Sequence, residues 1–254
     1  MQPGLYPNLS LADYHAAPGF SKSDLDLVAR SSAHYRHGER EVTPAMRLGA
    51  AVHACVLEPE TWKARYTRAN GCRKADAESD RTVLSAADWD ACQRIRDAVW
   101  NHPTCQDLFS EGYAEHSAWW LDSETHLLCK CRPDWSRPGV LLDLKTATDA
   151  SPAGFTRAVE RYRYHVQAAY YLDGWPHAGG RAVDCFIFVV VEKTPPYAIG
   201  LYDLAAAMLE RGRARYRREL ATVNDCLTRQ HWPGYALAIV TVGKARPEPG
   251  LLFP

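Results

Sequence analysis

An apolar stretch near the middle of the chain is interrupted by a single charge. Residues 140–144 are apolar except for Asp143, and Lys145 follows directly after them. Burying an isolated charge is costly unless the charge is paired or bound to a metal. Asp134 precedes Asp143 by nine positions, and paired aspartates supply the hard oxygen ligands that Mg²⁺ or Mn²⁺ prefers. The segment therefore predicts either a divalent-metal site or a structural ion pair between Asp143 and Lys145.

A hairpin would bring these groups together. The turn sequence at 136–139 separates two segments of strand character, and alternate residues of a strand share a face. A metal bound there could lower the pKa of a water molecule and stabilise charge on a phosphate, with Lys145 orienting that water or offsetting negative charge. The residues expected to share a face are Lys130, Arg132 and Asp134 on the first strand, and Asp143 and Lys145 on the second.

Four motifs in a fixed order extend this pattern over most of the chain. They are Gly49-Ala-Ala-Val-His53, Arg132-Pro133-Asp134, Asp143-Leu144-Lys145 and Gln167-Ala-Ala-Tyr-Tyr171. With these motifs the chain resembles the PD-(D/E)xK nuclease superfamily, specifically its RecE-type (exonuclease VIII) and lambda-exonuclease-like branch. The similarity spans about residues 13–175.

The resemblance implies a role for each matching residue. Metal ligands would be Asp134, Asp143, the backbone carbonyl of Leu144 and, for a second ion, His53. Lys145 would act on the attacking water, while Gln167 and Tyr171 would support the site and contact the DNA end. Glu115 corresponds to a glutamate that recurs in the family, so it would either bind the metal or contact the residues that do. The structural alternatives are a core histidine at 53, an ordinary helix-surface pair at 167 and 171, and an exposed strand-edge acid at 115.

Basic residues near these motifs are candidates for binding DNA. Phosphate contacts position a protein on nucleic acid, and three such candidates precede Gln167 on the same predicted helix, namely Arg161, Arg163 and His165. The arginines at 211–218 spread around a helix at about 100° per residue, which is more typical of a solvated face.

The elements that would position these residues follow from periodicity. Apolar spacing predicts helices after Ser21 or Ser23 and over 45–57, 86–100, 153–173 and 204–229. Alternation predicts a meander of antiparallel strands at 115–121, 126–134 and 139–146, and further strands at 182–191 and 197–203. Residues 5–18 and 66–82 are predicted as loops, and 232–254 as an irregular tail.

The fold class expected is α/β (α+β), and the resemblance implies a restriction-endonuclease-like core with a central mixed sheet flanked by helices. We expect one nuclease domain over residues 1–254. Its parts would be a helical region of about 1–105, a catalytic sheet core of about 106–230 and the tail from 231.

Composition excludes several classes of protein. The chain has 30 basic and 30 acidic residues and 46% apolar residues, which argues against disorder and against nonspecific coating of nucleic acid. No apolar run approaches the roughly 20 residues of a membrane span. The first ten residues show no basic region followed by an apolar one, as a secretory signal would, so a cytoplasmic location is expected. The eight cysteines are expected to be reduced, with Cys129 and Cys131 in a core rather than in a zinc site with His126.

The resemblance also implies a function. It implies a Mg²⁺-dependent exonuclease, with Mn²⁺ able to substitute, that degrades one strand of duplex DNA from the 5′ end. Such an enzyme releases 5′-mononucleotides and leaves 3′ single strands for recombination by strand annealing. A ring-shaped trimer or tetramer and a single-strand annealing recombinase as partner are implied too. The alternatives are a PD-(D/E)xK endonuclease or repair nuclease, and a DNA-end-binding module without turnover.

Overall fold

A five-stranded mixed sheet forms the centre of the fold. The computed structural model describes residues 1–39, 43–69, 80–237 and 239. The strand order is β10-β9-β8-β7-β4, where β8 and β9 are parallel and the other neighbours are antiparallel. The strands are β4 (Tyr113–Ala114), β7 (Trp135–Arg137), β8 (Gly139–Ala147), β9 (Val183–Glu192) and β10 (Ile199–Tyr202).

A second, antiparallel sheet lies beside the first. Its order is β1-β5-β6, with β1 at Gly4–Tyr6, β5 at Ser117–Leu121 and β6 at Leu128–Cys131. The strands predicted as one meander therefore separate into two sheets, and the hairpin that closes at 138 is β7–β8. Lys130 lies on β6, where its ammonium donates to the carbonyls of Tyr14 and Ala17 at 2.8 and 2.6 Å. The expectation that Lys130 shares a hairpin face with Asp134 is wrong for this reason.

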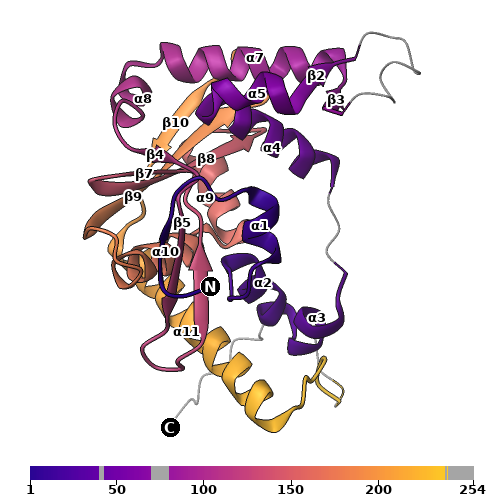
Figure 1. Ribbon diagram of the computed structural model, residues 1–254, viewed down its shortest axis with the longest axis vertical. Coiled ribbons are helices and arrows are strands. Elements are labelled where there is room, and N and C mark those ends of the chain that lie inside the picture. The colour runs from indigo at the N-terminus through magenta and orange to yellow at the C-terminus, as the bar shows by residue number, and fades with distance from the viewer. Residues whose placement is uncertain (40–42, 70–79, 238, 240–254) are drawn as a thin grey trace, which may run out of the picture.

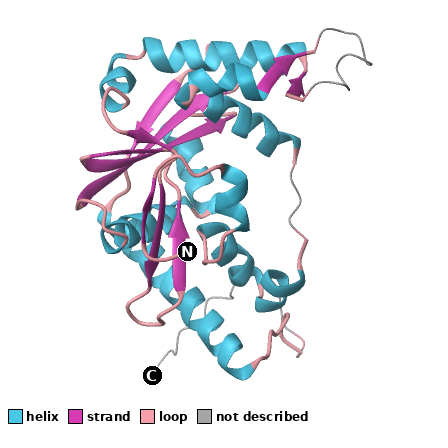
Figure 2. Ribbon diagram, in the orientation of Figure 1, coloured by secondary structure: helices cyan, strands magenta, loops and turns pink. Residues whose placement is uncertain are grey.

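Helices cover both faces of the central sheet, as Figures 1 and 2 show. On one face, α4 (Pro44–Leu57), α5 (Pro59–Arg65), α7 (Ala86–Asn101) and α8 (Pro103–Leu108) share a core with Leu142 and Leu144 of β8. On the other, α9 (Pro152–Tyr162), α10 (Tyr164–His177) and α11 (Ala206–Arg229) share a core with Leu141 and Phe188. The shorter helices α1 (Leu11–Ala16), α2 (Lys22–Arg30) and α3 (Ser32–His37) lie on the side of α10 and α11. The expected mixed sheet flanked by helices is confirmed.

Capping residues fix where several helices begin. Ser21 and Asp24 form a reciprocal capping box at α2, and Ser85 accepts from the backbone N–H of Asp88 at α7. The helix predicted over 153–173 is instead two helices, because Arg163 adopts left-handed torsions of 58° and 41°. This break separates α9 from α10.

Some regions predicted as loops contain regular structure. The segment at 5–18 includes part of β1 and all of α1, and 66–82 begins with β2 (Tyr66–Arg68), which pairs in parallel with β3 (Thr82–Leu84). Residues 70–79 and 240–254 of the predicted loop and tail lie outside the described residues. Within the described part, no helix is both long and apolar enough to cross a bilayer.

The two strand cysteines belong to the core. Cys129 and Cys131 are fully buried, and burial raises the pKa of the Cys129 thiol to about 12. Neither belongs to a cluster of potential metal ligands among the described residues. The core packing expected for them is confirmed.

Candidate active site

The two aspartates meet through the β7–β8 hairpin. Asp134 comes directly before β7 and Asp143 lies within β8, so the pairing of Trp135 with Leu142 places them opposite each other. One carboxylate oxygen of Asp134 accepts the backbone N–H of Leu144 at 2.6 Å. The side chain of Leu144 is buried on the opposite face of the sheet. The strand alternation thus turns Leu144 into one core while Asp143 and Lys145 face the other side.

Asp143 is held from two directions. Its Oδ1 accepts the amide N–H of Gln167 at 2.5 Å, and its Oδ2 lies 2.5 Å from the ammonium of Lys145. Gln167 comes from the first turns of α10, so this helix fixes the carboxylate through the amide. Tyr171, one turn further along α10, is buried beneath the site at 8% exposure. The structure therefore brings together both aspartates, the lysine and both α10 motif residues.

His53 faces the same point from α4. Its Nδ1 lies 3.2 Å from Oδ1 of Asp134. The imidazole is not a core histidine in an apolar setting, because it lines a cleft. His53 and the Leu144 N–H thus contact different oxygens of the Asp134 carboxylate.

Glu115 completes the cluster. Its φ of 53° is left-handed, which is uncommon for a residue other than glycine, and its N–H donates to the carbonyl of Asp134 at 3.0 Å. Arg132 donates to the Glu115 carboxylate at 2.6 Å and also to Ser117 Oγ and the Leu9 carbonyl. The potential ligand atoms of His53, Glu115 and Asp134 all lie within 4.8 Å of one another.

The pKa values show how negative this cluster is. Burial opposes protonation of His53, yet the Asp134 carboxylate raises its pKa to about 9. For Asp134 burial favours the neutral acid, but His53 and Lys145 together hold its pKa below the usual value. Burial and the charge of Asp134 raise the pKa of Glu115, and burial raises that of Asp143 against the attraction of Lys145. Carboxylates packed this closely need a neighbouring cation.

The donor set fits a hard divalent cation. Carboxylate oxygens, a backbone carbonyl and one imidazole are the ligands that Mg²⁺ or Mn²⁺ accepts. The three-residue ligand cluster is partly exposed, so an ion could enter from solvent. The residues present therefore suit a metal of this class.

A cleft of about 1280 Å³ opens above the cluster. Its walls come from α1, α2, α4 and the α9–α10 junction, and Gly49 on α4 leaves open space where a side chain would stand. The cations that line it are Lys22, Arg65, Arg132, Lys145, Arg161 and Arg163. A substrate strand could reach the carboxylates from this side.

The three predicted phosphate contacts differ in placement. Arg161 is exposed and lines the cleft, whereas the guanidinium of Arg163 is paired with Asp26 and Glu219. His165 is fully buried, with its ring nitrogens on the Val159 carbonyl and the Arg215 guanidinium. The phosphate contact expected of His165 is at odds with this burial, because the break at Arg163 turns the ring away from the cleft.

The arginines of α11 are mostly engaged within the protein. Arg211 pairs with Glu160, Arg213 with Asp173 at 2.7 Å, and Arg217 with Asp122. They tie α11 to α9, α10 and the β5–β6 turn.

Two site neighbours are absent from the sequence predictions. Tyr164 lies with its ring centroid 4.8 Å from the Lys145 ammonium, and Lys22 donates to the Tyr162 carbonyl at 2.7 Å. Tyr164 stands three positions before Gln167, so its position one helical turn away was the signal available. Lys22 is distant from the site in sequence and adjacent to it only in space, so no sequence signal pointed to it.

Comparison with known proteins identifies the family. Residues 19–241 match the model of a family described as a PDDEXK-like domain of unknown function (DUF3799). The chain belongs to this family. The PDDEXK-like assignment confirms the superfamily resemblance drawn from the four motifs, and it supports a nuclease. No curated protein matches the chain significantly.

A solved structure shares the fold. The crystal structure of a protein described as a "Putative exonuclease" from Eubacterium rectale superposes with a TM-score of 0.63 at 16% sequence identity. The match covers 87% of this chain and 88% of that one. The likeness extends over nearly the whole of both chains and supports the PDDEXK-like fold.

Proposed function

We propose that the protein is a Mg²⁺-dependent exonuclease that degrades one strand of duplex DNA from the 5′ end. The observation that carries the proposal is the convergence of Asp134, Asp143 and Lys145, of which Asp134 and Lys145 line an open cleft. The PDDEXK-like family and the fold of the neighbouring structure support it. In this proposal the enzyme releases 5′-mononucleotides and leaves 3′ single strands for strand annealing.

The chain's own residues have distinct tasks in this reaction. Asp134, Asp143, Glu115, His53 and the Leu144 carbonyl would hold the metal. When bound, a divalent ion activates water and stabilises charge on the scissile phosphate. Lys145 places a positive charge beside Asp143, where it offsets negative charge that develops on the phosphate oxygens. Gln167 holds the Asp143 carboxylate in a fixed rotamer, and Tyr171, one turn further along α10, packs against Phe186 and so helps to fix the helix.

End-labelled duplex DNA tests the proposal. Linear duplexes carrying a label at either the 5′ or the 3′ end are incubated with Mg²⁺ or with chelator, alongside a covalently closed circle. We expect release of 5′ mononucleotides from the linear substrate only, with no release in chelator. Asp143→Asn should abolish release, and Asp97→Asn, an exposed acid on α7 outside the cleft, should leave it unchanged.

The other outcomes separate the alternatives. Cutting of the closed circle would indicate an endonuclease or repair nuclease. Tight binding to DNA ends with no release under any condition would indicate an end-binding module. Release that persists in chelator would contradict the metal-dependent mechanism.

The assembly and the partner are part of the same proposal. Because the net charge is zero, a ring would concentrate the cleft cations around DNA while the outside stays neutral or acidic. Light scattering should give the mass of a trimer or tetramer, and a monomer that digests long duplexes processively would rule the ring out. The 3′ strand would pass to a single-strand annealing recombinase, which co-purification with such a protein would test.

A further inference from the structure

An exposed aromatic ring lies at the wall of the cleft. Three of the large apolar side chains that are exposed in the described part also line the cleft, namely Leu11, Met46 and Tyr162. Tyr162 is the aromatic one of the three and is 49% exposed. An amphipathic ring that faces a nucleic-acid cleft offers a flat surface for a base.

The ring of Tyr162 is the outermost member of an aromatic series. It lies 5.6 Å from the ring of Tyr164 at an interplanar angle of 29°, and Tyr164 lies 5.6 Å from Phe188 at 30°. Phe188 is fully buried on β9. The series therefore begins in the core, passes Tyr164 beside the Lys145 ammonium and ends at solvent.

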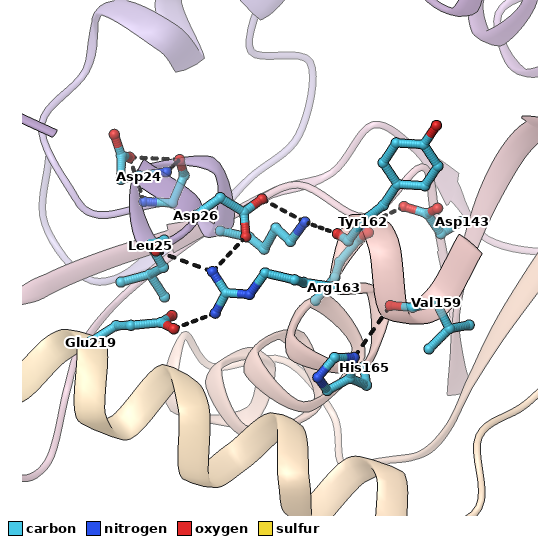
Figure 3. A network of polar contacts seen from close by, with 12 residues as sticks. Asp24, Leu25, Asp26, Asp143, Val159, Tyr162, Arg163, His165 and Glu219 are labelled. Atoms are coloured by element: carbon cyan, nitrogen blue, oxygen red, sulfur yellow. Dashed lines mark hydrogen bonds and ion pairs between the residues drawn. The ribbon is translucent and has the colours of Figure 1, made fainter. Parts of the chain in front are cut away.

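The backbone of Tyr162 is held from several sides. Lys22 donates to its carbonyl at 2.7 Å, and the next residue, Arg163, is paired with Asp26 at 3.0 Å and with Glu219. Figure 3 shows this network, with the Tyr162 ring pointing away from it. Because these contacts fix the backbone, only the side-chain torsions of Tyr162 remain to be ordered when a ligand stacks on the ring.

An exposed guanidinium adjoins the ring. Arg161 is exposed, and among the described residues it is the cleft-lining cation to which no carboxylate is paired. Its guanidinium lies 5.3 Å from the Tyr162 ring centroid. The pair thus combines an aromatic face with a charge that can bind phosphate.

We propose that Tyr162 and Arg161 bind one nucleotide of single-stranded DNA. The base stacks on the Tyr162 ring, and its phosphate pairs with Arg161. Because every base has a π face, the site tolerates any sequence. The proposal rests on the proposed function, since the strand reaches the site through the catalytic cleft.

Fluorescence of 2-aminopurine tests the site directly. Short single strands carrying this base at successive positions are titrated with the protein in Ca²⁺, and stacking on a tyrosine quenches the signal. Wild type should quench one position most strongly. Tyr162→Ala should remove that quenching and weaken binding roughly tenfold, whereas Tyr162→Phe, which keeps the ring, should bind like wild type. Tyr235→Ala, at an exposed tyrosine outside the cleft, is the matched control.

The outcomes separate the site from the nuclease. If wild type degrades DNA and Tyr162→Ala binds single strands as tightly as wild type, the stacking site is overturned and the nuclease stands. Loss of affinity in Tyr162→Phe equal to that in Tyr162→Ala would also overturn stacking. If wild type quenches 2-aminopurine through Tyr162 but degrades no DNA, the site stands and the nuclease fails.

Discussion

Replacing Glu219 with glutamine tests the polar network that holds the start of α10. Glu219 lies on α11, is 7% exposed and pairs with Arg163. Burial raises the pKa of its carboxyl from 4.5 to about 7, with Arg163 opposing that rise. The folded protein therefore keeps a proton that the unfolded chain releases over this interval.

The sign of the effect follows from that difference. Stability contributed by the protonated carboxyl is complete below about pH 4.5 and is lost as the pH rises through about 7. At about 1.4 kcal/mol per pKa unit, the interval between the two pKa values amounts to about 3 kcal/mol. Glutamine cannot ionise and still offers Arg163 an oxygen acceptor. Glu219→Gln should thus gain stability relative to wild type as the pH rises.

Urea unfolding followed by circular dichroism measures this difference. Wild type and Glu219→Gln are compared at several pH values from below the unfolded pKa to above the folded one. The matched control is Glu160→Gln, whose acid pairs with Arg211 at the surface with 44% side-chain exposure. Such a pair contributes about 1 kcal/mol or less. Parallel pH profiles for wild type and Glu219→Gln would refute the reasoning and mean that Arg163 keeps Glu219 ionised.

Three further predictions concern the cleft. Lys145→Ala should lower kcat by about 10²–10³-fold, and Gln167→Leu, which removes the amide from Asp143, should lower it by about 10–100-fold. Steady-state digestion measures both rates. Unchanged rates would remove these residues from the mechanism. Gly49→Ala should raise the free energy of unfolding by up to about 1 kcal/mol, since the added Cβ would have no atom within 4 Å. Gly49→Trp should raise KM for duplex DNA at an unchanged Tm. An unaltered KM would place the substrate elsewhere. Mn²⁺ at about 100-fold over its Kd should stabilise wild type by about 2.7 kcal/mol, as measured by thermal unfolding. Asp134→Asn should lose that gain in stability. An equal gain in the variant would place the ion at other ligands.

The placement of the acidic residues follows from local patterning. A strand alternates its side chains, so Asp143 and Lys145 had to share one face while Leu142 and Leu144 shared the other. Both pairs lie as expected on β8. Alternation does not require knowledge of the partner strand, and this is why the sequence was sufficient here.

Local alternation does not determine which sheet a strand joins. Residues 126–134 have the pattern of a strand, and β6 forms there, but it pairs with β5 rather than β8. The choice depends on long-range contacts, since the bridge between Phe20 and Cys129 and the bonds from Lys130 to the α1 region hold β6 in the smaller sheet. Nothing within 126–146 indicates this separation.

The break at Arg163 has the largest consequence for the site. Left-handed torsions are expected at glycine or asparagine, so an arginine at position 163 gives no signal of a break. The bend is compensated by contacts remote in sequence, because Asp26 on α2 and Glu219 on α11 both pair with the Arg163 guanidinium. A continuous helix would place His165 one turn after Arg161 on the same face, whereas His165 is buried in the core.

The same bend positions residues both at the exposed wall of the cleft and at the candidate active site. On the α9 side of the bend, Arg161 and Tyr162 are exposed and line the cleft. On the α10 side, Tyr164 lies beside Lys145, and Gln167 donates to Asp143. One residue with left-handed torsions, paired with Asp26 and with the buried Glu219, therefore determines where a strand would enter and how the Asp143 carboxylate is oriented.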